Sequence, residues 1–339
     1  MDDYFKDAEQ IQEIINRASK IVILQADIPD GDSLGSALAL ENIFGDMGKQ
    51  PFLYCGVHTP EYLRYLTGWD RVSQELPTNF DISIIVDTSA DNLFDSLVRS
   101  NQHKWLTTKP CIVIDHHMGT PNISYATVVF NRPAVATSEV IYQLAKKLNW
   151  PLNHDANENL LAAMMSDSLG LTSEATTAKS IRVVADIVES GVSVAGLEDR
   201  RRNLMRKKPE TLSYKGELLQ RVEYFDNNRL AIITIPWEEI QKYSYDYNPS
   251  MLVLDDMRMV VGVDVAIAYK IYKDGRITAK IKCNYGKGIG LQLAEHFGGG
   301  GHSYASGYKI TDGRTLEEIK NETVAKASEL LNSLEEKST

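Results

Sequence analysis

The chain has 339 residues, of which 43% are hydrophobic and 24% charged, and its formal net charge at pH 7 is −10. The length suffices for two hydrophobic cores. The negative charge argues against a broad surface for duplex nucleic acid, because such surfaces depend on Lys and Arg contacts to phosphates. The three cysteines lie far apart and form no CxxC pair, which argues against a disulfide framework and a thiolate zinc site.

Short apolar runs alternate with helical spacing through the first half of the chain. This alternation, over about residues 1–190, predicts an α/β domain with a doubly wound parallel sheet and right-handed crossovers. The predicted strands are 21–24, 51–54, 82–86 and 111–114, and the predicted helices are 5–19, 33–48, 135–148, 158–165 and 177–190.

The pattern changes after Gly191. Charged residues over 191–225 predict a helical linker. Residues 226–335 then predict a smaller α+β domain built from sequential strands. Its predicted elements are a strand at 229–235, a hairpin of 260–272 and 277–283, and helices at 291–296 and 316–334.

Three predicted strands of the first domain run into acidic or histidine residues. In a doubly wound sheet, ligands bind at the carboxyl ends of the strands. Carboxylates and imidazoles that converge there are suitable ligands for Mn²⁺, Mg²⁺ or Zn²⁺. The sequence therefore predicts a metal-dependent hydrolase. The residues concerned are Asp30 and Asp32 after the first strand, Asp87 after the strand 82–86, and Asp115, His116 and His117 after the strand 111–114.

Two further features add to this set. Asp167 follows the predicted helix 158–165 and could complete the metal ligands, although an Asp-Ser-x-Gly segment alone is typical of a cap or turn. Asp115 is a candidate acceptor for the second ring nitrogen of a ligating imidazole. Asp30-Gly31-Asp32, taken alone, is also compatible with an ordinary solvated turn.

A run of four glycines, Gly298–Gly301, precedes His302 in the second domain. Such a loop has unshielded amides that can approach an anion, and His302 could add a hydrogen bond or a positive charge. Lys280 and Lys282 alternate on a predicted strand nearby. Lysines in that pattern commonly solubilise a sheet edge, or they could meet a substrate phosphate.

Together these motifs resemble the DHH phosphoesterase superfamily with its C-terminal DHH-associated domain. The resemblance covers about residues 10–332, and the length is similar to that of the nanoRNase and pAp phosphatase branch. The motifs that carry it are 29–36 (PDGDSLGS), 86–89 (VDTS), 114–117 (IDHH), 166–168 (SDS) and 298–302 (GGGGH).

The resemblance implies a site for two divalent ions, typically Mn²⁺, with Mg²⁺ or another divalent ion as the alternative. Asp87 would bridge both ions, while Asp32, His116 and Asp167 would complete one site and Asp30 would belong to the other. The resemblance also implies catalytic roles for His117, Asp115 and His302. It further implies substrate binding, in a cleft between the domains, by Gly299, Gly300, Gly301, His302 and Lys282.

One departure concerns the first motif. The family carries a histidine four residues before the first aspartate, where this chain has Ala26. Alanine cannot ligate a metal, so the first ion site is weakened unless Gln25, Asp27 or water substitutes. A second departure is the segment 280–283 (KIKC), where relatives often have arginine and serines. Lysine offers a point charge in place of a bidentate fork.

The expected activity is hydrolysis of short oligonucleotides (nanoRNA, or dinucleotides such as pApA) or of pAp, by water activated between two metal ions. The alternatives are a nucleotide-binding sensor with impaired catalysis, a cyclic-dinucleotide phosphodiesterase, a single-strand exonuclease and, less favoured, a pyrophosphatase. Expected partners are short single-stranded RNA or DNA or small nucleotides, with no duplex nucleic acid and no membrane. A homodimer is expected from relatives, and the absence of an apolar leader near Met1 makes the cytoplasm the default location.

Overall fold

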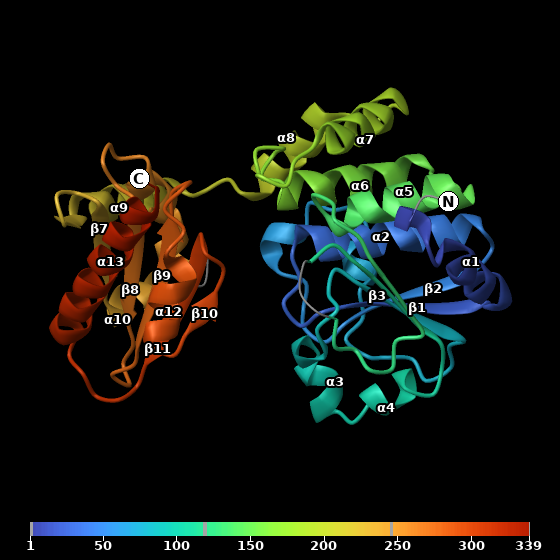
Figure 1. Cartoon of the computed structure of the whole chain (residues 1–339), viewed down its shortest axis with the longest axis horizontal. Helices are drawn as coiled ribbons and strands as arrows, with labels where there is room; N and C mark the ends of the chain where they lie inside the picture. Colours follow the sequence, from blue (N-terminus) through green and yellow to red (C-terminus); the bar gives the residue numbers. More distant parts are fainter. Residues whose placement is uncertain (1–2, 118–120, 245–246, 339) are drawn as a thin grey trace. The chain divides into compact units, whose positions relative to one another are not determined.

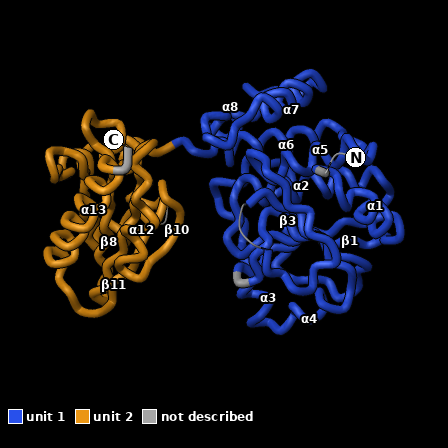
Figure 2. The backbone as a smooth tube through the Cα atoms, viewed as in Figure 1, with its two compact units in different colours: residues 1–206 blue, residues 207–339 orange. Residues whose placement is uncertain are grey.

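The computed structural model describes residues 3–117, 121–244 and 247–338. The chain forms two compact units, Met1–Arg206 and Lys207–Thr339 (Figures 1 and 2). The boundary between them falls inside the segment predicted as a linker. Helix α8 (Val194–Leu204) belongs to the first unit and helix α9 (Pro209–Gln220) to the second.

The first unit contains a five-stranded sheet in the order β2-β1-β3-β4-β5, and all its neighbouring strands are parallel. The predicted doubly wound parallel sheet is therefore confirmed. This order reverses direction between β1 and β3, which makes the crevice at their carboxyl ends the expected ligand site. The strands are β1 (Lys20–Gln25), β2 (Gln50–Cys55), β3 (Ile82–Val86), β4 (Cys111–Asp115) and β5 (Val128–Asn131).

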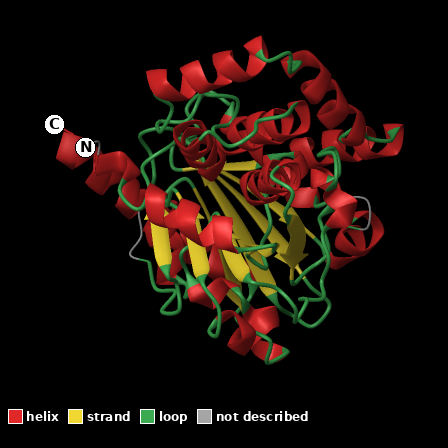
Figure 3. Ribbon diagram, turned by 90° about the vertical axis from the view of Figure 1, so that its right-hand side faces the viewer, coloured by secondary structure: helices red, strands yellow, loops and turns green. Residues whose placement is uncertain are grey.

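Helices cover both faces of this sheet (Figure 3), and alternate side chains of each strand enter different cores. Ile21 and Ile23 of β1 pack with α2, whereas Val22 and Leu24 pack toward α3 and α4. Burial on both faces explains why the central strands are mostly apolar. The helices are α1 (Ala8–Arg17), α2 (Gly31–Asp46), α3 (Asp95–Arg99), α4 (His103–Leu106), α5 (Thr137–Leu148), α6 (His154–Asp167) and α7 (Ala178–Glu189), with 3₁₀ turns at Asp3–Phe5, Glu61–Leu63, Trp69–Arg71 and Asp91–Leu93.

Two glycines let α2 lie very close to α6. A Cβ atom at Gly31 would lie 2.1 Å from Ser166 Oγ, and one at Gly35 would lie 2.7 Å from the Asn159 carbonyl oxygen. Contacts this short are not possible between real atoms, so only glycine permits the observed approach. The close approach brings the first turn of α2 next to the last turn of α6.

Two helix boundaries differ from the prediction in ways that affect the site. Helix α2 begins at Gly31 because the Asp30 side chain caps it by accepting hydrogen bonds from the amides of Asp32 and Ser33. Helix α6 continues to Asp167, which is therefore the last helical residue and not part of the following loop. Strand β5 has no counterpart in the prediction, because it is short and only its alternate residues are buried.

The second unit contains a six-stranded mixed sheet in the order β10-β11-β9-β8-β7-β6. Strands β6 to β9 are neighbours in chain order, as predicted for sequential strands, although β7 and β8 pair in parallel. Strand β8 also starts later than predicted, because residues 259–262 form a turn. The strands are β6 (Glu223–Phe225), β7 (Leu230–Ile235), β8 (Val265–Ile271), β9 (Ile277–Cys283), β10 (Gly300–Gly301) and β11 (Ala305–Ile310).

The two faces of this second sheet have different surroundings. Ile267, Tyr269 and Ile281 pack with α12 and α13 in one core. Ala266 and Ala268 face the other way and pack with α9, α10 and α11 in a second core. The remaining elements are α10 (Trp237–Tyr243), α11 (Leu254–Arg258), α12 (Gly290–His296), α13 (Leu316–Ser338) and a 3₁₀ turn at Pro249–Leu252. Among the described residues, no helix is long and apolar enough to cross a membrane.

Candidate active site

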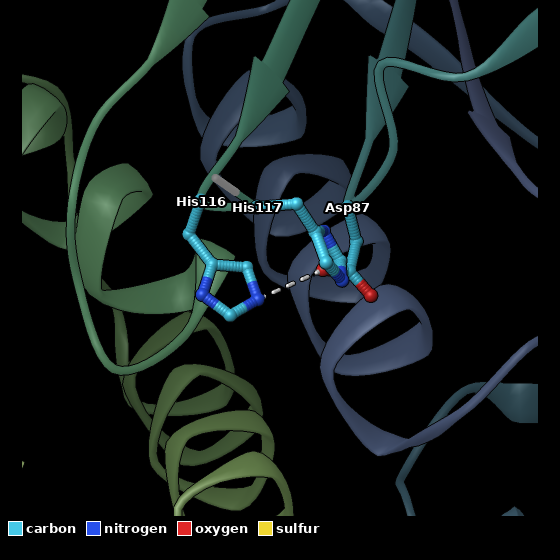
Figure 4. Close-up of side chains that lie close together, drawn as sticks. All are labelled: Asp87, His116 and His117. Carbon is cyan, nitrogen blue, oxygen red and sulfur yellow. Dashed lines mark ion pairs between the residues drawn. The ribbon is translucent and has the colours of Figure 1, made fainter. Parts of the chain in front are cut away.

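Three carboxylates of the first unit surround one imidazole at the carboxyl edge of the sheet. The Nε2 atom of His116 lies 3.5 Å from Asp167 Oδ2, 3.6 Å from Asp87 Oδ1 and 3.9 Å from Asp32 Oδ2. These side chains come from the end of β4, the end of β3, and helices α2 and α6. Figure 4 shows His116 and His117 directed toward Asp87.

The orientation of His116 is fixed from its other side. Its Nδ1 atom lies 3.2 Å from the carbonyl oxygen of Ala134. Because a carbonyl can only accept, Nδ1 donates this hydrogen bond, so in a neutral ring it is the lone pair of Nε2 that faces the carboxylates. A lone pair that faces three carboxylates is stabilised by a cation between them. One nitrogen and three carboxylates suit Mn²⁺, Mg²⁺ or Zn²⁺, so the residues present fit a metal centre.

Two overlapping groups of side chains could hold metal ions. Within each group the ligand atoms lie within 4.8 Å of one another. Asp32, His116 and Asp167 form one group, and Asp87, His116 and His117 form the other. The structure therefore brings together four of the five residues predicted as metal ligands: Asp32, Asp87, His116 and Asp167.

The carboxylates of this cluster destabilise one another's charged forms. Burial raises the pKa of Asp87 well above its ordinary value, and the nearby charges of Asp32 and Asp30 raise it further. Burial, followed by the charge of Asp32, raises the pKa of Asp167 to about 6. Such mutual repulsion is typical of groups that share a cation.

The fifth predicted ligand, Asp30, lies outside both groups found among the described residues. Its Oδ1 atom accepts hydrogen bonds from the amides of Asp32 (3.0 Å) and Ser33 (2.9 Å). At the position of the missing histidine, Ala26 is buried. Asp27 Oδ2 accepts a hydrogen bond from the Ser96 amide at 2.7 Å, so its carboxylate is directed toward α3.

The start of helix α5 also contributes to the site, and the sequence reasoning missed it. The amides of Thr137 and Ser138 donate to Asp32 at 2.6 and 3.1 Å, and the Thr137 hydroxyl donates to Asp87 Oδ1 at 3.0 Å. Glu139 holds this turn by accepting a hydrogen bond from the Val135 amide at 3.0 Å. The one sequence signal was a threonine near the start of a predicted helix, a common position for a cap.

His117 and Asp115 form a second hydrogen-bonded pair. His117 Nδ1 donates to Asp115 Oδ1 at 2.8 Å, and Ser89 Oγ donates to Asp115 Oδ2 at 2.7 Å. The hydrogen bond to Asp115 raises the pKa of His117, although partial burial opposes it. Burial alone would raise the pKa of Asp115, but the hydrogen bonds from His117 and Ser89 outweigh it and lower that pKa.

The second unit has a cavity of about 770 Å³ that contains most of its predicted substrate-binding residues. Lys282 and Gly299–Gly301 line it, whereas exposed His302 is not among its described lining residues. The predicted free amides are only partly available, because the Gly299 amide donates to the Ala294 carbonyl at 2.8 Å. Gly299 is instead required by packing, since a Cβ there would lie 2.2 Å from the Gly307 carbonyl oxygen.

Residues 20–167, which contain the whole carboxylate cluster, match the family model described as DHH family, N-terminal domain. The first unit contains a DHH-family domain. The cluster at the ends of β3 and β4 lies within this DHH-family domain, and the cavity described above lies outside the matched residues.

Three known proteins are similar to this chain over most of its length. A protein of Thermus thermophilus named bifunctional oligoribonuclease and PAP phosphatase NrnA is 23% identical over 90% of this chain and 88% of its own length. A Bacillus subtilis protein of the same name is 24% identical over 83% of this chain and 86% of its own length. A solved structure of an exopolyphosphatase-related protein from Bacteroides fragilis has the same fold, with a TM-score of 0.85 and 21% identity over 96% of this chain and 98% of that one.

Proposed function

We propose that this chain is a divalent-metal-dependent phosphoesterase that hydrolyses short oligonucleotides, including dinucleotides such as pApA, or pAp. The observation that supports it is the convergence of Asp32, Asp87 and Asp167 on the Nε2 atom of His116. The DHH-family domain and the names of the two NrnA relatives favour the same chemistry. Mn²⁺ is the proposed ion.

In this proposal Asp32, Asp87, His116 and Asp167 hold metal, and Asp30 contributes to the first ion site, which Ala26 weakens. Bound divalent ions supply a nucleophilic water and neutralise charge on the phosphoryl oxygens. The hydrogen bond from Thr137 orients Asp87.

His117 is the proposed contact for the scissile phosphate. Its Nδ1 proton is held by Asp115, which leaves Nε2 as the atom directed to the substrate. Because Asp115 also accepts from Ser89, the imidazole is held in one orientation. Gly299–Gly301, Lys282 and His302 of the second unit are the proposed substrate contacts beyond the metal centre.

The direct test is turnover by the purified full-length chain. With Mn²⁺ present, we expect hydrolysis of pApA or pAp to exceed hydrolysis of cyclic di-AMP or pyrophosphate. Asp87→Asn should reduce the rate at least about 100-fold, because a ligand on the reacting centre is lost. The control is Asp95→Asn, an exposed carboxylate in the first turn of α3. Full activity of Asp87→Asn would contradict the proposed mechanism, in which Asp87 holds a metal ion.

One observation favours a second candidate, a nucleotide sensor with impaired catalysis. Ala26 takes the place of a family ligand, while Asp27 is hydrogen-bonded to Ser96 and Asp30 caps α2. A sensor would bind nucleotides tightly with no turnover of any substrate in the panel.

Ala26→His tests whether the metal position that lacks the family's histidine is merely weakened, as the phosphoesterase proposal requires. If the position is merely weakened, the added imidazole should raise Mn²⁺ affinity about 10-fold or more, as measured by calorimetric titration. Turnover should rise with it. An unchanged Mn²⁺ affinity would mean that another side chain, or water, already fills the position.

A further inference from the structure

The cavity of the second unit is strongly positive. Four lysines line it, and its described lining residues include no aspartate or glutamate. The lysines come from three neighbouring strands, β8, β9 and β11. They are Lys270, Lys280, Lys282 and Lys309.

The strand register places these lysines in successive rows on one face of the sheet. Thr278 of β9 pairs with Lys270 of β8 on one side and with Lys309 of β11 on the other. Two residues further along β9, Lys280 lies between Ala268 and Gly307, and two residues beyond it comes Lys282. Because side chains alternate along a strand, positions two apart share a face.

Small residues on both sides of Lys280 make this face hollow. Neither Ala268 nor Gly307 has a side chain long enough to cover the sheet, and a Cβ at Gly307 would already lie 2.6 Å from the Ala279 carbonyl oxygen. The hollow therefore exposes the lysine rows to a ligand that lies along β9.

These positive charges have no counter-charge in the described part of the chain. Lys270 and Lys309 make no side-chain hydrogen bond or ion pair there, and Lys280 contacts only the sulfur of Met251, at 3.7 Å. Burial, followed by the charge of Lys280, lowers the pKa of Lys270 to about 8. A half-buried ammonium group without a partner is unfavourable unless an anion binds it.

We propose that Lys270, Thr278 and Lys309 bind a phosphate that is not cleaved, so that this face holds the backbone of a single-stranded oligonucleotide. This proposal rests on the proposed function, in which Lys282 and the glycines contact the nucleotide that is cleaved. Successive rows are about 7 Å apart, which is similar to the spacing of neighbouring phosphates in an extended single strand. A trinucleotide can therefore reach the row of Thr278, whereas pAp cannot.

Binding without hydrolysis tests the proposal. The full-length chain is titrated, in excess chelator, with a 5′-phosphorylated trinucleotide and separately with pAp, at several salt concentrations. In Lys270→Met/Lys309→Met the trinucleotide affinity should fall about 10-fold, and the slope of log K against log salt should decrease in magnitude by roughly 0.7, the value for one phosphate of a single strand that is no longer neutralised. The affinity for pAp should change by less than about twofold, because it does not reach this row.

Two control variants isolate the row. Lys273→Met removes an exposed lysine at the turn between β8 and β9 that does not line the cavity, so it should bind both ligands as the wild type does. Lys270→Arg keeps the charge and should keep both the trinucleotide affinity and the salt slope. A double variant that binds the trinucleotide as tightly as the wild type overturns the proposal, and so does an equal loss of affinity for both ligands.

A small diester separates this proposal from the proposed function. Bis(4-nitrophenyl) phosphate has no second phosphate, so the wild type and Lys270→Met/Lys309→Met should hydrolyse it equally with Mn²⁺. Absence of hydrolysis by the wild type would count against the proposed function alone. Normal hydrolysis combined with unchanged trinucleotide binding would count against the lysine row alone.

Discussion

Asp87 shows how much one residue of this site departs from an ordinary carboxylate. Its φ angle is 62°, in the left-handed region that few residues other than glycine, asparagine and aspartate adopt. Its side chain is buried, and burial together with Asp32 raises its pKa. Without a cation these features destabilise the folded protein, as is common at functional sites.

Asp87→Asn should therefore stabilise the metal-free protein. Asparagine tolerates the same backbone conformation and cannot repel Asp32, so we expect a gain of about 1 kcal/mol, or roughly 2–4 °C in the melting temperature. The measurement is thermal unfolding in chelator, with Asp95→Asn as the control. With Mn²⁺ the order should reverse, because the wild type alone keeps this ligand. A lower melting temperature of the variant in chelator would contradict the argument.

Some residues of the cluster could be predicted because they follow buried strands directly. Asp87 and His116 are examples, since the carboxyl ends of parallel strands must meet at one edge. Thr137 could not be predicted, because its contact with Asp32 depends on where α5 packs. The spacing Asp-x-x-Ser is a capping pattern and partly indicated that Asp30 caps α2. The sequence analysis instead interpreted Asp30 as a metal ligand.

At the scale of elements, the pairing of α2 with α6 positions two of the carboxylates. Gly31 and Gly35 are one turn apart on α2 and face α6. Asp32 lies between them in sequence, and Asp167 lies at the end of α6. The proposed metal centre therefore depends on how closely these two helices approach.

Gly35→Val should separate the helices. Its side chain would overlap the Asn159 carbonyl and Ala163, so we expect a loss of about 2–3 kcal/mol of unfolding free energy. Mn²⁺ affinity should fall as well, because Asp32 and Asp167 move apart. Urea unfolding and calorimetric metal titration measure the two effects.

The same helix provides the control. Gly45 also lies in α2, but a Cβ there meets nothing within 4 Å, so Gly45→Ala should stabilise the protein by about 0.5–1 kcal/mol. If both variants behaved alike, the effect would come from helix propensity and not from the approach to α6.

The strands that could be predicted are those with long apolar runs, such as β3 and β4. Strand β10 could not, because it consists of glycines and exists only through its pairing with β11. Gly299 and Gly301 were interpreted as an anion loop, whereas close packing against β11 also requires them. The parallel pairing of β7 with β8 depends on the crossover through α10 and α11, which local sequence does not specify.

At the scale of the whole molecule, the two units are stabilised by separate cores. The ionisation of a side chain in the second unit therefore affects the unfolding of that unit. Lys270 has a pKa of about 8 when folded and an ordinary value of 10.5. Between these values the unfolded chain binds more protons than the folded one, so stability rises with pH. Below pH 8 both states carry the proton and the penalty for burying the charge is constant.

Lys270→Met should remove this rise. Relative to the variant, the wild type should gain stability from about pH 8 to 10.5, by less than about 1.4 kcal/mol per pH unit, because the side chain is only partly buried. Urea unfolding at three pH values across this range measures the difference. The unfolding free energy of Lys273→Met should change with pH as that of the wild type does. If the unfolding free energy of Lys270→Met also followed the wild type, the lowered pKa of Lys270 would be contradicted.

The separate cores of the two units have an evolutionary consequence. A substitution on the lysine face of the second sheet changes neither the packing of α2 against α6 nor the carboxylates on these two helices and at the end of β3. Under the proposed function, mutations that alter which ligands are retained can therefore accumulate while the proposed metal ligands stay in place. Selection can diversify specificity in such a chain without first losing its chemistry.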